Sequence, residues 1–184
     1  KFMLLKRIIR IFWLLFGLGI IFSIIIFTLI STGIIGYMPP IEELENPKNN
    51  FATEVYTSDG VVLNTYYHKN TGNRVMVSYN QLSPNVVNAL ISTEDVRFTK
   101  HSGIDVKAIF RAIVKRGLFF NKKAGGGSTL SQQLAKQLYT PRAENKLERL
   151  MQKPIEWVIA VKLERFYTKE EILTMYLNQY DFSN

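Results

Sequence analysis

The sequence predicts a mainly α-helical domain preceded by one membrane-spanning helix and a small β element. Three features carry this prediction: an uncharged apolar run from Ile11 to about Tyr37, two β-like segments around an Asp-Gly turn, and helical spacing of apolar residues from Ser83 onward. With 21% charged and 12% aromatic residues, the 184-residue chain is not wholly disordered. It contains no cysteine, which excludes disulfides and cysteine-ligated metal sites.

The apolar run is long enough to cross a lipid bilayer. A spanning helix needs ~20 mostly apolar residues, whereas the apolar part of a cleavable signal peptide usually has only ~7–15. We therefore expect a membrane anchor over residues 11–38, which Pro39 and Pro40 end because proline has no backbone N–H to donate. The flank at residues 1–10 is free of acids and contains four basic residues, Lys1, Lys6, Arg7 and Arg10. Because positive flanks stay inside, the N-terminus should be cytoplasmic and everything after Pro40 outside.

The net charge of +8 has to be divided between the two sides of the membrane. Excess positive charge is a usual footprint of nucleic-acid binding. Once the basic flank is set aside, however, only 19 basic residues face 15 acidic ones in the rest of the chain. An exported, membrane-tethered domain meets anionic lipid headgroups and lipid-linked phosphates. We therefore expect a membrane partner and no nucleic acid.

Residues 39–82 are expected to form a linker and a small β element. Residues 41–52 are polar and form the linker. Two β-like runs follow, Glu54–Thr57 and Val61–Tyr67, and the Asp-Gly pair between them is a strong hairpin signal. A third strand is expected over Arg74–Tyr79.

The rest of the chain is expected to be helical, and capping residues predict where its helices begin. Pro154 should kink the longest helix or divide it in two. The expected helices are one capped by Ser83 and starting at Pro84, one capped by Asp105 and running to about Arg116, one capped by Ser128 and running to about Tyr139, one from Asn145 to about Phe166, and one over Lys169–Tyr180 with a capping box of Thr168 and Glu171.

The segment EDVRFTKHSGID, from Glu94 to Asp105, is the first candidate for chemistry. Glu94 and Asp95 fall near the C-terminal end of the first expected helix, where the macrodipole disfavours negative charge. A carboxylate placed there without a cation suits a general base. An ordinary solvated acidic pair, with Phe98 in the core and His101 as a cap, is the alternative, and the pair by itself does not decide between them.

The segment AGGGSTLSQQLAKQ, from Ala124 to Gln137, is the second. Its glycines lead into a helix start at Ser128-Thr129, whose free N–H groups and positive dipole end are a natural place for phosphate. The Gly-Lys-Ser/Thr ending of a Walker loop is absent. Three glycines also make a flexible loop, which stays open as the alternative. Gln132, Gln133 and Lys136 follow one and two turns further on.

Two further segments lie in the expected C-terminal helices. In ERLMQKPIEWVIAVKLE, Lys153 and Glu156 share a helix face, with Arg149 one turn earlier. A surface ion pair is the alternative for this set. TKEEILTMYLNQYDF forms an amphipathic helix whose apolar residues favour a core role.

Taken together and in this order, the four segments resemble the family 51 peptidoglycan glycosyltransferases, which include the glycosyltransferase domains of class A penicillin-binding proteins and the monofunctional enzymes. The resemblance covers roughly Val55 to Phe182. One position departs from it, because Gln152 stands where the R-K-x-x-E pattern has arginine. The matching positions are Glu94, Asp95, Phe98, His101 and Gly103 for E-D-x-x-F-x-x-H-x-G; Gly126, Ser128, Thr129, Gln132 and Gln133 for G-x-S-T-x-x-Q-Q; Lys153 and Glu156 for R-K-x-x-E; and Lys169, Ile172, Leu173, Tyr176, Leu177 and Asn178 for K-x-x-I-L-x-x-Y-L-N.

The resemblance implies a lysozyme-like head with a membrane-proximal jaw over residues 83–184, and polymerisation of lipid II with release of undecaprenyl pyrophosphate. Glu94 would be the general base for the 4-hydroxyl of the acceptor, and Glu156 a second carboxylate at the donor pyrophosphate. Lys136 and Lys153 would hold pyrophosphate oxygens. The implied substrate-binding set is Asp95, Phe98, His101, Gly126, Ser128, Thr129, Gln132, Gln133, Lys136, Arg149 and Lys153.

The resemblance also implies the setting of the protein. The partners would be lipid II, the growing glycan chain, the membrane and other cell-wall synthesis proteins, at the plasma membrane of a bacterium. A divalent cation, Mg²⁺ or Mn²⁺, at the pyrophosphate fits the family, although no set of protein ligands is evident. Residues 117–123 are either a membrane-dipping part of the jaw or an exposed loop. Domains of this family continue beyond the fourth motif, so we expect a chain truncated at its C-terminal end.

Two other functions remain open at this point. A lysozyme-like hydrolase also uses two carboxylates on an α-rich fold, and it would cleave finished peptidoglycan. A catalytically weak membrane scaffold would bind lipid II without turnover, which the Gln152 departure and the shortened domain make conceivable.

Overall fold

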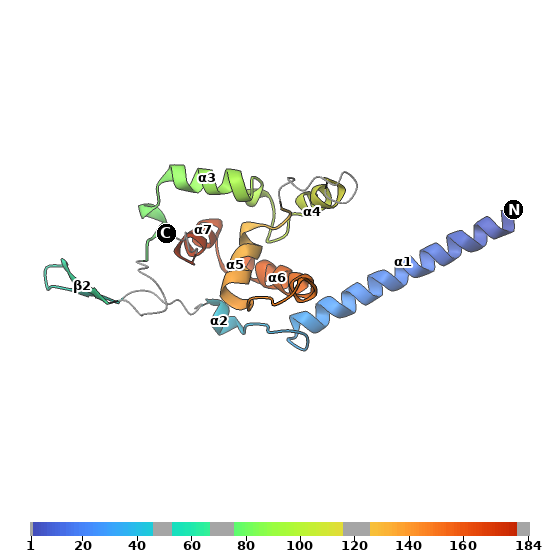
Figure 1. The fold of residues 1–184 in the computed structure, drawn as a ribbon, viewed down its shortest axis with the longest axis horizontal. Coiled ribbons are helices and arrows are strands. Elements are labelled where there is room, and N and C mark those ends of the chain that lie inside the picture. Colours follow the sequence, from blue (N-terminus) through green and yellow to red (C-terminus); the bar gives the residue numbers. More distant parts are fainter. Residues whose placement is uncertain (1, 46–52, 67–75, 116–125, 180–184) are drawn as a thin grey trace.

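The computed structural model describes residues 2–45, 53–66, 76–115 and 126–179. It confirms the mainly helical architecture with a long apolar N-terminal helix and a small β element (Figure 1). The helices are α1 (Phe2–Ser31), α2 (Ile41–Glu45), α3 (Pro84–Glu94), α4 (Val106–Ile113), α5 (Leu130–Tyr139), α6 (Lys146–Phe166) and α7 (Lys169–Gln179); the strands are β1 (Thr53–Tyr56) and β2 (Val62–Tyr66); and short 3-10 turns lie at Tyr79–Gln81 and Phe98–Lys100.

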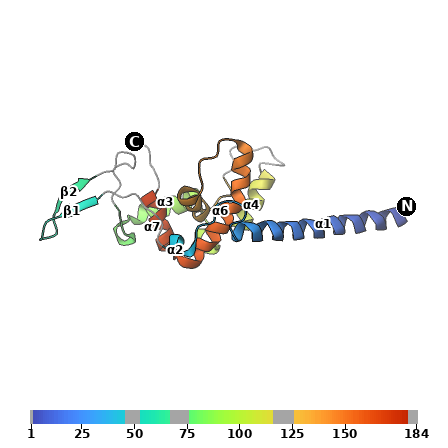
Figure 2. The same cartoon turned by 90° about the horizontal axis from the view of Figure 1, so that it is seen from below.

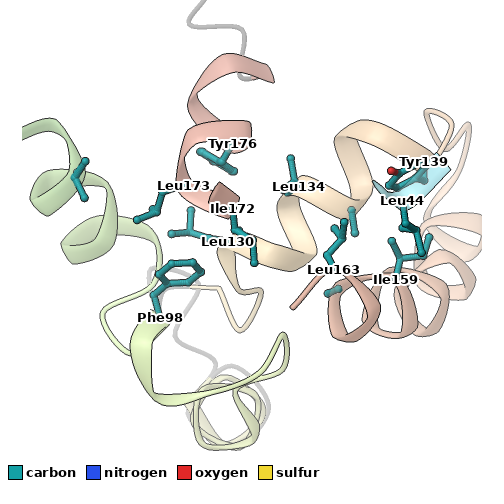
Figure 3. Close-up of a cluster of buried hydrophobic side chains, with 13 residues drawn as sticks. Leu44, Phe98, Leu130, Leu134, Tyr139, Ile159, Leu163, Ile172, Leu173 and Tyr176 are labelled. Carbon is teal, nitrogen blue, oxygen red and sulfur yellow. The ribbon is translucent and has the colours of Figure 1, made fainter. Parts of the chain in front are cut away.

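The core forms where α5 packs between α6 and α7. Leu130 and Leu134 lie one turn apart on α5 and are fully buried against both neighbours. Figure 3 shows their side chains meeting Leu163 from α6 and Ile172 from α7. Each such aliphatic side chain contributes about 1.5–3 kcal/mol by leaving water, so the three helices that carry the second, third and fourth motifs form one packed unit.

The long apolar helix α1 projects away from this core (Figure 2). It contains a stretch, Met3–Ser31, that is long and apolar enough to cross a membrane by length and composition. Most of its side chains are exposed, but its last turns are docked: Phe27 stacks on Trp157 of α6 with ring centroids 6.4 Å apart, and Ile30 is only 2% exposed. The end of α1 is therefore attached to α6.

The segment after α1 is not the simple linker expected from the sequence. Ile41–Glu45 forms α2, and Leu44 is fully buried in the core, while residues 46–52 lie outside the described parts. The hydroxyl of Tyr139 donates to the Glu43 carbonyl at 3.1 Å, and that of Tyr167 donates to the Leu44 carbonyl at 2.5 Å. Burial raises the pKa of Tyr139 above its ordinary 10.0, so its hydroxyl stays protonated and able to donate.

The expected hairpin is present as an antiparallel β1–β2 pair with the Asp-Gly turn between the strands, and it extends away from the core (Figure 1). The expected third strand is wrong where it can be compared. Residues 76–78 are not a strand and Tyr79 begins a 3-10 turn, while residues 74 and 75 lie outside the described parts. The Val77 backbone pairs with a side chain instead, donating to Asn178 Oδ1 at 3.0 Å and accepting from Asn178 Nδ2 at 2.9 Å.

The predicted caps of α4 and α7 are confirmed: Asp105 caps α4, and Thr168 with Glu171 forms the capping box of α7. Ser83 lies at the N-cap position of α3, but its side chain makes no capping hydrogen bond. Asn145, expected as the first residue of α6, is its cap. Thr129, not Ser128, caps α5, since α5 begins at Leu130, and the Ser128 hydroxyl accepts a hydrogen bond from Lys153.

α6 is one continuous helix with Pro154 inside it, so of the two expected effects the proline does not divide the helix. The α-helical part of α4 ends at Ile113, and residues 114–115 continue it as π-helix to the limit of the described residues, so the expected end near Arg116 stays a prediction. Tyr180, the expected end of the last helix, also lies outside them.

Gly103 lets the loop after α3 lie directly against α6. Its φ is +91°, a conformation that L side chains rarely adopt. A Cβ at this position would lie 2.8 Å from the carbonyl carbon and oxygen of Ala160. The backbone of the loop and the backbone of α6 are therefore closer than any side chain would permit.

We expect Gly103→Ala to lower the free energy of unfolding by about 2 kcal/mol or more, because it adds backbone strain and a clash with α6. The measurement is chemical or thermal denaturation in detergent. Gly60→Ala is the matched control: its φ is also positive, at +82°, but no described atom lies within 4 Å of the added Cβ. An unfolding midpoint for Gly103→Ala equal to that of the control would contradict this account.

Candidate functional site

A cavity of about 250 Å³ lies where the end of α3, the face of α4 and the start of α5 meet. Most of its lining comes from the first and second motifs, which are far apart in sequence. The lining residues are Ser92, Thr93, Glu94, Asp95, Val96, Arg97, Asp105, Ala108, Arg111, Gly126, Ser128, Thr129 and Gln133.

Glu94 is the last residue of α3, and its side chain is exposed at this cavity. The amide Nε2 of Gln133 donates to Glu94 Oε2 at 2.9 Å. The hydroxyl of Tyr176 donates to the other end of the same amide, Oε1, also at 2.9 Å. Side chains of the first, second and fourth motifs thus meet at the Glu94 carboxylate.

Asp95 is buried at the N-terminus of α5, unlike its neighbour Glu94. Its Oδ2 accepts the Leu130 backbone N–H at 3.1 Å and lies 3.0 Å from His101 Nε2. A carboxylate at a helix N-terminus is stabilised by the macrodipole. The phosphate site expected at the start of α5 is therefore already filled by a protein anion, with the Gln132 N–H also taken by its Thr129 cap.

Several of the predicted binding residues are buried and shape the site from behind. Phe98 is fully buried, and the ammonium of Lys169 lies 4.2 Å from its ring centroid and donates to the His101 carbonyl at 2.8 Å. Gln132 is 1% exposed, and its amide donates to the Gly103 carbonyl at 3.1 Å. Phe98, His101 and Gln132 are not among the residues that line the cavity.

The third motif forms a charged cluster on α6. Glu156 is fully buried and pairs with two cations, Lys153 at 2.9 Å and Arg149 through a short bidentate contact. Lys153 also donates to the Ser128 hydroxyl at 3.1 Å. Because Ser128 lines the cavity, this cluster borders the space that Glu94 faces, with two positive charges against one negative.

The departure at Gln152 has a structural counterpart. Gln152 is buried, its amide donates to the Pro141 carbonyl at 3.2 Å, and its Oε1 accepts from Arg149 at 3.3 Å. The guanidinium beside Glu156 therefore comes from Arg149, which lies one turn before Gln152 on the helix. Lys136, in contrast, is exposed on α5 and lies outside the cavity lining. Its side chain makes no ion pair or hydrogen bond with the described residues.

Sequence reasoning missed Arg97, Asp105 and Arg111 as lining residues, although all three lie in or just after the first motif. Arg97 Nε contacts Asp105 Oδ2 at 2.8 Å, and the same carboxylate caps α4 by accepting the Ala108 N–H at 3.1 Å. Burial acts to raise the pKa of Asp105, but the hydrogen bonds from Ala108 and Arg97 outweigh it and leave the pKa below its ordinary 3.8. Asp105 is therefore a charged structural link beside the cavity.

Within the described parts of the chain, no group of three or more His, Asp or Glu side chains could hold a metal ion. The buried carboxylates in and near the cavity lining are already paired, Asp95 with His101, Asp105 with Arg97 and Glu156 with its two cations. These residues do not form a ready ligand set for a divalent cation.

A family model described as transglycosylase matches residues 59–184. The chain belongs to this transglycosylase family. The matched range includes α3 to α7 and every residue that lines the cavity, whereas α1 and α2 precede it. All four segments that carry the sequence resemblance therefore lie within the transglycosylase region.

Relatives of this transglycosylase include penicillin-binding proteins and a biosynthetic peptidoglycan transglycosylase. It is 34% identical over 142 residues to penicillin-binding protein 1A of Escherichia coli, which covers 77% of this chain and 16% of that protein. It is 41% identical over 114 residues to penicillin-binding protein 1F of Bacillus subtilis, covering 62% and 15%. It is 45% identical over 102 residues to the biosynthetic peptidoglycan transglycosylase of Nitrosomonas eutropha, covering 55% and 40%. The alignments thus span less than half the length of these relatives.

We expect Asp105→Ala to lower the free energy of unfolding by about 1–2 kcal/mol at neutral pH, because it removes the cap of α4 and the partner of Arg97. The folded-state pKa of Asp105 is lowered, so its stabilisation is present above pH 3.8 and is lost as the pH falls through that lower value. Denaturation of both proteins at several pH values tests this. Asp105→Asn keeps a capping oxygen and should lose less, and a difference from wild type that grows in acid would refute the prediction.

Proposed function

We propose that this transglycosylase polymerises lipid II into glycan strands, with Glu94 as general base. The observation that carries the proposal is that an exposed carboxylate lines one cavity and that a cluster with excess positive charge contacts Ser128 in the lining of the same cavity. Glu94 lines the cavity from α3, and Ser128 lines it while accepting a hydrogen bond from Lys153. A glycosyl transfer with a pyrophosphate leaving group needs both a proton acceptor and cations.

In this proposal the 4-hydroxyl of the acceptor lipid II lies against the Glu94 carboxylate. Its oxygen attacks the anomeric carbon of the growing chain and forms the new glycosidic bond with inversion. Glu94 takes the hydroxyl proton as the bond between the anomeric carbon and the pyrophosphate oxygen breaks. The pyrophosphate leaves with that electron pair on undecaprenol. The exposure of Glu94 supports this role, since the carboxylate is open to a substrate hydroxyl.

The cations for the leaving group would come from side chains, since protein acceptors already fill the start of α5. Lys153 and Arg149 are each about 30% exposed, so they can reach a phosphate while paired with Glu156. Glu156 would then hold these two cations in place. Stabilising the negative charge that develops in the transition state usually contributes more to such catalysis than any other single effect. A divalent cation, Mg²⁺ or Mn²⁺, would have to be bound chiefly by the pyrophosphate itself, and no step of this mechanism passes through it.

The proposed substrate is borne by a membrane lipid, and two surfaces fit that setting. α1 would anchor the chain in a bacterial plasma membrane with a single span and a cytoplasmic N-terminus. α4 lies on the side of the domain from which α1 projects (Figure 2) and exposes an apolar stripe of Val106, Phe110 and Ile113 next to the basic Lys107 and Arg111. Such a helix suits the surface of an anionic membrane. Residues 117–123, the predicted jaw segment, lie outside the described parts.

We expect Glu94→Gln to reduce polymerisation of purified lipid II by at least about 10²-fold, because the amide cannot accept the hydroxyl proton. Its thermal stability should stay near that of wild type, since the side chain is exposed. Glu170→Gln, an exposed acid on α7, is the matched control and should keep full activity. A Glu94→Gln variant with full activity would sink the mechanism. Cleavage of finished peptidoglycan would point instead to a hydrolase, and lipid II binding without turnover to a scaffold.

We expect Lys153→Met to lower the polymerisation rate by about 10²-fold even at saturating lipid II, because a cation that stabilises the leaving group is lost. Initial rates measured against lipid II concentration separate this from weaker binding. Lys162→Met removes a cation from the same helix, one whose hydrogen bond within the described residues goes to the Ser31 carbonyl at 3.4 Å, and it should have little effect. Equal rates for the two variants would count against a role for Lys153.

A further inference from the structure

The amide of Gln133 joins two side chains that the proposed mechanism treats separately. Its Nε2 contacts Glu94 Oε2 and its Oε1 contacts the Tyr176 hydroxyl, both at 2.9 Å. The three residues come from α5, α3 and α7. Tyr176 is 2% exposed and packed in the core, Gln133 is half-buried, and Glu94 is exposed. The contacts therefore run from the rigid interior to the edge of the cavity.

The chemistry of the three groups sets the direction of these hydrogen bonds. An ionised carboxylate only accepts, so the NH₂ group of Gln133 has to face Glu94. The amide oxygen then faces Tyr176, whose hydroxyl has to donate. Each bond polarises the next in the same sense, which makes the Gln133 amide a better donor to the carboxylate. The arrangement thus fixes which end of the Gln133 amide faces Glu94 and strengthens its hydrogen bond to the carboxylate.

The same bonds also restrict the geometry of Glu94. A glutamate at the exposed end of a helix has several rotamers open to it. Gln133 holds one oxygen, Oε2, while Oε1 makes no hydrogen bond with the described residues and is left for a substrate proton. Because Gln133 is itself held by Tyr176, a buried side chain of α7 restrains a carboxylate at the end of α3. Restraining a reacting group in this way is a recognised source of rate acceleration.

Most other charged groups near Glu94 form ion pairs or hydrogen bonds with residues other than Glu94. Arg97 and Asp105 pair with each other, and Asp95 pairs with His101 and the start of α5. Arg111 lines the cavity from α4 but makes no ion pair with the described residues. Within those residues, Gln133 is the group that contacts the Glu94 carboxylate by a hydrogen bond.

We propose that Tyr176 is a positioning residue for the general base, acting through Gln133 to orient the Glu94 carboxylate. This inference rests on the proposed role of Glu94. It assigns the fourth motif a part in catalysis beyond the packing that its apolar residues provide. Tyr176 does not touch substrate in this account, so its removal lowers the rate and leaves substrate binding intact.

The test uses the full chain in detergent with Tyr176→Phe, which removes only the hydroxyl. We expect kcat for lipid II polymerisation to fall about fivefold, the size of one lost hydrogen bond, with KM within about twofold of wild type. Tyr139→Phe is the matched control: it removes another tyrosine hydroxyl from a backbone carbonyl at the α2 contact. It should lower stability without changing kcat.

A double-mutant cycle separates a relay from two independent effects. Gln133→Met keeps the side-chain length but removes both hydrogen-bonding groups, and it should lower kcat at least as much as Tyr176→Phe. In the Gln133→Met background, Tyr176→Phe should then cause no further loss, because the link is already broken. Losses that multiply would overturn the relay, as would a Tyr176→Phe variant with unchanged kcat.

A measurement that needs no activity keeps this inference separate from the proposed function. The environment of the Glu94 carboxyl at neutral pH can be followed by its ¹³C NMR chemical shift on glutamate-labelled protein, with its signal assigned by its loss in Glu94→Gln. We expect this chemical shift to change in Tyr176→Phe and to stay unchanged in Tyr139→Phe. If wild type forms no polymer, the proposed function fails while this chemical shift still decides the relay. An unchanged chemical shift in Tyr176→Phe would overturn it.

Discussion

The buried start of α5 is the constraint on which the site depends. The first N–H groups of a helix have no partner inside it, and burying them unpaired is costly. Here the Asp95 carboxylate takes the Leu130 N–H and the Thr129 hydroxyl takes the Gln132 N–H. Because Asp95 directly follows α3, this requirement joins the end of α3 to the start of α5. Glu94, one residue earlier, is thereby placed at the rim of the cavity.

The loop after α3 is held from a second side by Gly103. Its carbonyl accepts from both the Thr129 hydroxyl, at 2.7 Å, and the Gln132 amide, while its missing side chain allows contact with α6. The buried polar groups of the first two motifs are thus largely used for architecture. The exposed charged residues in the cavity lining are Glu94 and Arg111, and the partly exposed cations of the α6 cluster lie next to Ser128. These charged groups are the ones that suit a substrate.

The α6 cluster shows how a departure from a motif can be structurally compensated. Gln152 replaces the arginine of the family pattern, yet Glu156 still has a guanidinium beside it because Arg149 lies seven residues earlier on the same face. A fully buried glutamate without cations would be strongly destabilising. The pairing with Arg149 and Lys153 therefore explains how Glu156 can be fully buried in a domain whose third motif is altered.

The sequence by itself determined the helical class, the apolar span, the hairpin and most helix caps, because these follow from local periodicity, from length and from side chains that bond within one turn. It also located the four segments that carry the family resemblance. The tertiary structure alone decided which residues meet. Thr129 rather than Ser128 caps α5, and the Ser128 hydroxyl accepts a hydrogen bond from Lys153, which is distant in sequence. The expected linker became α2 because Leu44 finds a place in the core. Whether a residue is buried architecture, like Asp95 and Gln132, or an exposed group, like Glu94, depends on long-range packing, which spacing along the chain does not encode.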